Sequence, residues 1–219
     1  MKIFAFTGLF RIFISRRIAM TNTTFYQAIE KRRSIYALGK EKPVNEERVR
    51  EIIQFAVTHV PSAFNSQSAR VVILFGKESG KFWELVKEAL RKIVPPEQFP
   101  KSEEKIDGFN AGWGTVLFFE DQAVVKQLMN DFSLYADNFP VWSNQSNGML
   151  QFAIWTGLES EGLGSSLQHY NELVEDAVRK EWKIDPSWKL LAQMPFGSVE
   201  APAGEKSFNP IEERVKVFG

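Results

Sequence analysis

Two adjacent arginines and a serine are the residues of this sequence best suited to binding chemistry. Arg32, Arg33 and Ser34 stand where a short amphipathic helix is expected to end. Two guanidinium groups followed by a hydroxyl can bind a phosphate or another anion, because their donors match the oxygens of such groups. The loop 61–68, one helix further along, offers amide and hydroxyl groups. Together the two segments indicate a bound polar cofactor.

A structural role for the arginine pair is the simpler alternative. Cationic side chains at the end of a helix interact favourably with the helix dipole, which contributes only about 0.3 to 1 kcal/mol. Asn65 in the loop and Lys206 near the C-terminus favour the binding role. With them, three remote segments could converge on one ligand.

The composition excludes several classes of function. The 219 residues include 27 basic and 27 acidic side chains, so no overall field attracts nucleic acid or an anionic membrane. The absence of cysteine excludes disulfides and thiolate catalysis, and the two histidines leave few members for a metal site or a triad. We expect His59 to be structural or on the surface. His169 follows a glycine turn and is a candidate ligand-site residue.

The first 19 residues differ from the rest of the chain. They are mostly apolar, interrupted by Arg11 and followed by the pair Arg16 and Arg17. The run is too short and too interrupted to span a bilayer, and it lacks the features of a secretory signal. A leader or anchor is therefore the less favoured alternative. We expect residues 1–19 to be an extension of uncertain role and residues 20–219 to form one domain of a cytoplasmic protein.

Hydrophobic periodicity predicts helices that alternate with a few short strands. Helices are expected near residues 24–31, 45–60, 82–93, 121–134, 142–158 and 173–182, strands at 70–75, 114–119 and 190–197, and an extended segment at 215–218. Apolar side chains surround the helix expected at 142–158, so it should be buried within the protein or in a subunit interface. The pattern predicts an α+β or α/β layered domain.

Two further features bear on ligands. Gly162-Leu163-Gly164 begins like a dinucleotide fingerprint, but the third glycine is missing and helical residues precede it, so a Rossmann site is not favoured. The six tryptophans are expected in the core or an interface, although one or two could cover a flat ligand.

The order of these segments resembles the FMN-dependent nitroreductase family. The resemblance rests on the arginine pair, the loop 61–67, the glycines 162–164 and Lys206, and it covers roughly residues 21–218. The segment 167–171, with the sequence LQHYN, is similar to that of a short bacterial and yeast-type branch. The resemblance implies homodimers of α+β subunits, with a mixed sheet flanked by helices. It also implies one FMN in each of two sites built from both protomers.

The resemblance also implies which residues bind FMN. Arg32 and Ser34 match positions that hold the phosphate and the pyrimidine side of the ring. Arg33 would supply backbone or charge nearby, and Lys206 matches a phosphate-binding lysine. The partner subunit's loop, which touches ribityl and ring atoms, is matched by Ser62, Asn65 and Gln67. The segment that passes the redox edge of the flavin is matched by Leu167, Gln168 and His169, and Gly164 in the preceding glycine turn is a further cofactor-binding residue.

One position departs from the family pattern. Many members have a second basic residue two places after the lysine, where this sequence has Phe208. Either phosphate binding is weaker here or Arg214 substitutes.

The function implied by the resemblance is that of an oxidoreductase. It would take hydride from NAD(P)H through FMN and reduce nitroaromatic or quinone-type acceptors by a ping-pong mechanism. Because the flavin would carry the chemistry, no catalytic side chain is expected. The alternative is a flavin-binding stress or regulatory protein with little turnover. The expected partners are a second copy of the chain and small-molecule acceptors, with no nucleic acid and no membrane.

Overall fold

The computed structural model describes residues 24–219. The extension expected at residues 1–19, and the exact start of the domain after it, lie outside the described residues. Among residues 24–219, none of the helices has the length and apolar character needed to cross a membrane.

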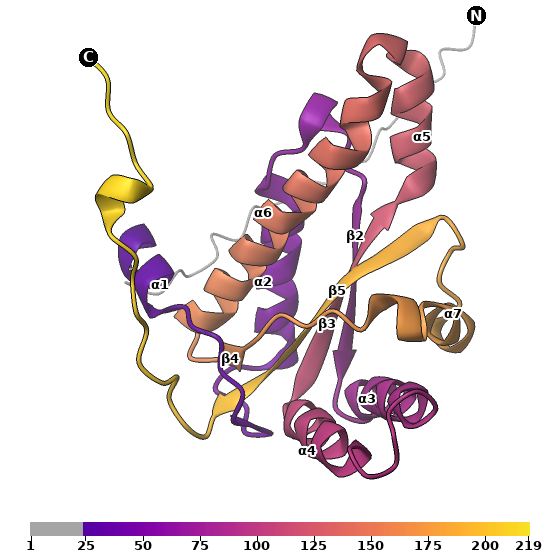
Figure 1. The fold of residues 1–219 in the computed structure, drawn as a ribbon, viewed down its shortest axis with the longest axis vertical. Helices are drawn as coiled ribbons and strands as arrows, with labels where there is room; N and C mark the ends of the chain where they lie inside the picture. The colour runs from indigo at the N-terminus through magenta and orange to yellow at the C-terminus, as the bar shows by residue number, and fades with distance from the viewer. Residues whose placement is uncertain (1–23) are drawn as a thin grey trace, which may run out of the picture.

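A central antiparallel sheet organises the fold (Figure 1). Four strands are paired in the order β1-β5-β3-β2, and β4 pairs with β5 beside them. The strands are β1 (Leu38–Gly39), β2 (Ala69–Phe75), β3 (Gly114–Asp121), β4 (Gly164–Ser165) and β5 (Trp188–Val199). The expected sheet is mixed, with both parallel and antiparallel pairing. Among the described residues, the parallel pairing consists of a single bridge between Ser34 and Ser165.

Helices cover both faces of the sheet. On one face lie α2 (Glu46–His59) and α6 (Phe139–Ser160), and on the other lie α3 (Lys77–Arg91), α4 (Phe99–Asn110) and α7 (Asn171–Trp182). Side chains alternate along a strand, so Val116 and Phe118 of β3 pack with α2 and α6, whereas Leu117 and Phe119 pack with the other three helices. Because both faces are covered, every residue of β3 is buried, including the apolar run 116–119. The predicted α+β fold is confirmed.

Local capping sets where the first helices begin and end. Thr24 accepts a hydrogen bond from the Gln27 backbone N–H and donates its own N–H to the Gln27 side chain, which is the predicted capping box of α1 (Phe25–Lys31). Asn45 caps α2 through the Arg48 backbone N–H. Since α1 ends at Lys31, the two arginines follow directly on the chain.

The long helix α6 has one buried and one exposed apolar face. Leu150, Ile154 and Leu158 are buried against the sheet. Met149 and Phe152 keep 46% and 39% of their surface exposed. The sequence predicts that this helix is apolar on all sides and buried in the protein or in a subunit interface. A second subunit could cover the side that is exposed in one chain, and that part stays a prediction.

Three segments differ from the sequence-based expectation. The helix α4 was not predicted. The helix expected over 121–134 ends earlier, as α5 (Gln122–Asp131), and a 3-10 helix, Ser133–Asn138, follows it. The extended segment expected at 215–218 joins no strand, because the C-terminal residues run past α1, away from the sheet edges (Figure 1). A 3-10 turn, Ile211–Glu213, precedes it.

Candidate functional site

A cavity of about 760 Å³ lies beside the end of α1. Its lining includes Arg32, Arg33, Ser34 and Lys206, together with Trp155 of α6. This volume lies within the range typical of small-molecule sites. Four residues predicted from remote segments are therefore brought together on one cavity.

Two hydrogen bonds to backbone carbonyls position these residues. The Ile35 N–H donates to the Ser165 carbonyl at 2.9 Å, which fixes the segment after α1 against β4. Nη2 of Arg33 donates to the carbonyl of Gly204 at 2.7 Å. The second bond holds the chain that follows β5 against the site, so Lys206 reaches the cavity.

Arg32 carries a positive charge that is poorly compensated. Within residues 24–219 its side chain makes no hydrogen bond or ion pair, and its Nε is buried without a partner. Its guanidinium carbon lies over the Trp155 ring, 4.4 Å from the ring centroid. Burial and the neighbouring Arg33 lower the pKa of Arg32, while Glu159 opposes the shift. Such a group favours the arrival of an anion.

Four buried polar atoms without a partner in the described chain lie in or beside the cavity. Nε of Arg32 and Nε1 of Trp155 belong to residues that line it and can donate a hydrogen bond to a phosphate, whereas Oγ of Ser165, a third donor, belongs to the small neighbouring cavity. The fourth is Oε2 of Glu159, and burial raises the pKa of that carboxyl although Lys31 and Arg32 act in the other direction. A phosphate monoester, with about −1.5 to −2 charges at neutral pH, matches two cations and a set of free donors.

Phe208, which stands where many family members have a second basic residue, lies next to Lys206. The Lys206 ammonium lies 5.0 Å from the centroid of the Phe208 ring. Arg214 follows the exposed 3-10 turn and is not among the residues that line the cavity of its own chain. Within one chain, therefore, Arg214 does not take the place of the missing second basic residue.

The loop with Ser62, Asn65 and Gln67 lines a different cavity, of about 630 Å³, beyond the C-terminal end of α2. One chain therefore does not bring this loop to the Arg32 cavity. The resemblance assigned the loop to the flavin of the partner subunit, and that assignment stays a prediction.

The loop 62–68 has a strained backbone. Phe64, Asn65 and Gln67 have φ values of 55°, 51° and 47°. This left-handed region costs most non-glycine residues about 1 to 2 kcal/mol, and asparagine tolerates it best. The hydroxyl of Ser62 holds the loop by accepting a hydrogen bond from the Gln67 N–H at 2.9 Å. Strain maintained in this way is typical of loops that bind ligands.

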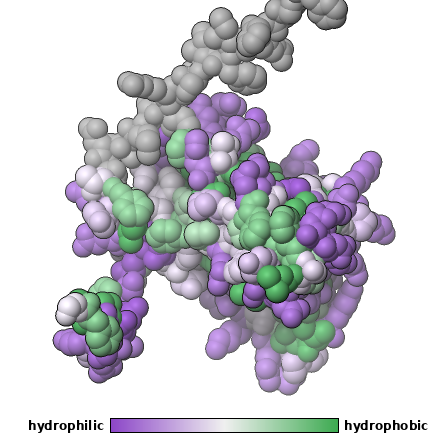
Figure 2. Space-filling model, turned by 90° about the horizontal axis from the view of Figure 1, so that it is seen from above, coloured by the Kyte–Doolittle hydropathy of each residue, from purple (hydrophilic) through white to green (hydrophobic). Residues whose placement is uncertain are grey.

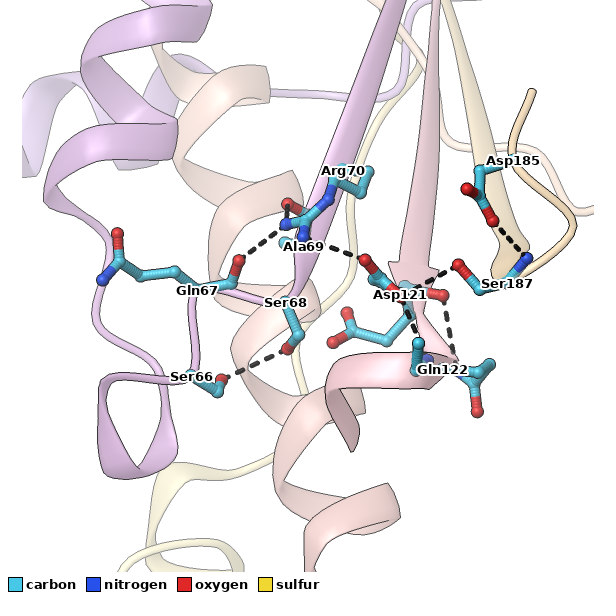
Figure 3. A network of polar contacts seen from close by, with 11 residues as sticks. Ser66, Gln67, Ser68, Ala69, Arg70, Asp121, Gln122, Asp185 and Ser187 are labelled. Atoms are coloured by element: carbon cyan, nitrogen blue, oxygen red, sulfur yellow. Dashed lines mark hydrogen bonds and ion pairs between the residues drawn. The ribbon is translucent and has the colours of Figure 1, made fainter. Parts of the chain in front are cut away.

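An arginine that the sequence analysis missed anchors the same loop (Figure 3). Arg70 donates one hydrogen bond to the Gln67 carbonyl at 2.7 Å and another to the Asp121 carboxylate at 2.9 Å. Ser187 also donates to Asp121, at 3.0 Å. The available signal was a charged residue at the start of an apolar strand. Arg70 thus fixes the loop to the sheet.

A bulky aromatic side chain in this loop packs onto the hairpin of α5 and α6. The Phe64 ring centroid lies 4.8 Å from that of Phe132, 5.2 Å from that of Phe139 and 6.0 Å from that of Trp142. Phe64 is nevertheless half exposed. Figure 2, which looks down on this end of the molecule, shows hydrophobic side chains gathered among polar ones.

We expect Gln67→Gly to raise the free energy of unfolding by about 0.5 to 1 kcal/mol, because glycine adopts a positive φ without strain. Urea unfolding measures the change. The matched control is Ser66→Gly, since Ser66 has an ordinary φ of −60° and should lose stability. Equal destabilisation by both substitutions would show that the loop is not strained at Gln67.

The segment after the glycines is only partly open to a ligand. Gly164 lies in β4, where an added Cβ would approach Ile35 and Val199 to 2.9 Å. Gln168 is buried and exchanges two backbone hydrogen bonds with Gln193. The side chain of Leu167 packs on the core and that of His169 is exposed. None of 167–169 lines the Arg32 cavity of its own chain.

Comparisons with known proteins agree with this architecture. The Nitroreductase family model matches residues 29–198. HBN1 of Saccharomyces cerevisiae is 36% identical over 197 residues, which are 89% of this chain and 97% of the yeast protein. Nitroreductase CinD from Lactococcus lactis in complex with chloramphenicol is 49% identical, with a TM-score of 0.83, and the match covers 90% of this chain and 100% of CinD.

A CinD structure with 4-nitrophenol is similar to the same degree, with 50% identity, a TM-score of 0.82 and the same coverage. A structure from Desulfovibrio desulfuricans in complex with FMN has a TM-score of 0.63, covers 89% of this chain and 97% of that chain, and at 20% identity shares the fold alone.

The fold and these comparisons thus support an oxidoreductase of the α+β class. The chain belongs to the nitroreductase family.

Proposed function

We propose that this protein is an FMN-dependent oxidoreductase that takes hydride from NAD(P)H and reduces nitroaromatic or quinone-type acceptors. The observation that carries the proposal is the cavity at Arg32, where two cations without ion pairs in the described chain, Arg32 and Lys206, face the same space. A phosphate-bearing cofactor would neutralise them. The complexes of CinD with 4-nitrophenol and chloramphenicol support a small aromatic acceptor.

In this proposal the residues bind and orient the cofactor. Arg32 and Lys206 hold the phosphate, Arg33 keeps the C-terminal segment in place, and Ser34 lies beside the flavin ring. Each hydrogen bond from a charged group contributes about 1.5 to 3 kcal/mol. Bound FMN would supply the redox chemistry, with the nicotinamide and the acceptor using it in turn by a ping-pong mechanism.

A second copy of the chain would complete the site. Ser62, Asn65 and Gln67 lie on a separate cavity of the same chain, so they reach the flavin only across a dimer interface. The segment 164–169 would then pass the redox edge of the ring, with Leu167, Gln168 and His169 nearest to it. The exposed apolar face of α6 supports such an interface.

An absorption spectrum and a turnover assay test the proposal. We expect the purified protein to be a yellow dimer by size-exclusion chromatography, to be bleached by NADH or NADPH without oxygen, and to regain colour when 4-nitrophenol is added. Free FMN at the same concentration is the control. Protein that stays colourless with added FMN would overturn the proposal, and bound flavin that neither nucleotide bleaches would favour the stress or regulatory protein.

A further inference from the structure

Trp155 contacts Arg32, one of the cations of the site. It lies on α6, and the guanidinium carbon of Arg32 is 4.4 Å from its ring centroid. Trp155 also lines the Arg32 cavity and the small cavity beside it that includes Gly164. Its own Nε1 is buried without a partner among the described residues. Trp155 thus packs on the hydrophobic core and also faces the site.

The geometry of the two groups explains what the contact does. A guanidinium is planar, and its five N–H donors lie in that plane. An aromatic ring below the plane attracts the cation through its face and leaves the donors at the edge free. The contact with the face of Trp155 therefore restricts the position of Arg32 without using the hydrogen bonds that an anion needs.

The other groups around Arg32 do not replace this contact. Glu159 lies one helical turn after Trp155, on the same face of α6. It attracts Arg32 electrostatically, yet the two form no ion pair within residues 24–219. Arg33, a neighbouring cation, repels Arg32 and donates its own hydrogen bond from Nη2 to the Gly204 carbonyl. Trp155 is thus the side chain that fixes where the Arg32 guanidinium lies.

We propose that Trp155 is a positioning residue for the phosphate end of the cofactor, acting through Arg32. The inference rests on the proposed function, because it takes the phosphate to be that of FMN. It adds to that function that the preference for a phosphate depends on the contact between Trp155 of α6 and Arg32 at the end of α1. Its signature is a preference for FMN over riboflavin, which lacks the phosphate.

The test measures dissociation constants of FMN and riboflavin by flavin fluorescence for the full chain, four variants and one control variant. We expect Trp155→Leu to reduce the preference for FMN over riboflavin about fivefold, with riboflavin affinity changed less than twofold. Trp155→Phe, which keeps a ring, should lose less. In the Arg32→Ala background, adding Trp155→Leu should leave the preference unchanged, because the two residues act as one unit.

The control is Trp182→Leu on α7, a half-buried tryptophan that hydrogen-bonds to Glu78 far from the site. It should leave the preference as in the wild type, whatever it does to stability. The inference would be overturned if Trp155→Leu left the preference for FMN unchanged or reduced the affinities for FMN and riboflavin equally. It would also be overturned if the effects of Trp155→Leu and Arg32→Ala on that preference were additive. If the wild-type protein bound FMN and riboflavin equally well, the inference about Trp155 would be overturned, but the proposed flavin-dependent function would not. Protein that binds neither would overturn both.

Discussion

We expect Arg32→Ala to lower the affinity for FMN by at least about tenfold. The loss follows from hydrogen bonds between a charged donor and a phosphate, each of which contributes about 1.5 to 3 kcal/mol, while tenfold corresponds to about 1.4 kcal/mol. Within residues 24–219 the side chain of Arg32 makes no hydrogen bond or ion pair. The substitution should therefore leave the fold intact, and fluorescence titration with FMN measures the effect.

Arg50→Ala is the matched control for this experiment. Arg50 lies on α2 and forms exposed ion pairs with Glu46 and Glu47, which contribute little to stability. The control should bind FMN as the wild type does. If Arg32→Ala retained wild-type affinity, the phosphate would have to be bound elsewhere.

Replacing Gly197 with alanine lowers the free energy of unfolding by at least about 3 kcal/mol. An added Cβ would overlap the carbonyl oxygen of Gly39 and lie 2.9 Å from the Trp113 backbone nitrogen. Both are backbone atoms, so no side chain can move aside. The clash would push β1 away from β5, and urea unfolding measures the loss.

Gly108→Ala is the control for Gly197→Ala. Gly108 lies inside α4, where an added Cβ would have no heavy atom within 4 Å. Alanine has a higher helix propensity than glycine by about 1 kcal/mol, so this variant should be more stable than the wild type. If Gly197→Ala were as stable as the wild type, the close approach of β1 to β5 would be wrong.

The sequence predicted elements with a strong local signal and missed those that depend on tertiary contacts. The caps at Thr24 and Asn45 and the apolar run of β3 are readable because each is a short local pattern. The helix α4 buries only Ile106 and Phe109 fully, so its periodicity is weak. The two-residue strands β1 and β4 are too short to show alternation at all.

The candidate site also contains residues that the sequence predicted and one that it did not. Residue types alone pointed to Arg32, Arg33, Ser34 and Lys206, and the structure gathers these four on one cavity. Trp155 was not predicted as part of the site, because its position depends on α6 packing next to the end of α1. A cluster of tryptophans in a sequence gives no indication of which one lies beside an arginine.

The hydrogen bond from Arg33 to Gly204 belongs to a part of the chain that the binding site needs and the sheet does not. Gly204 and Lys206 follow β5, the last strand of the sheet, so all the strand pairings exist without them. A chain that ended directly after β5 would keep its hydrophobic core and lose one wall of the cavity. During synthesis, the core can likewise form before the binding site does, and the final residues convert a folded scaffold into a competent one.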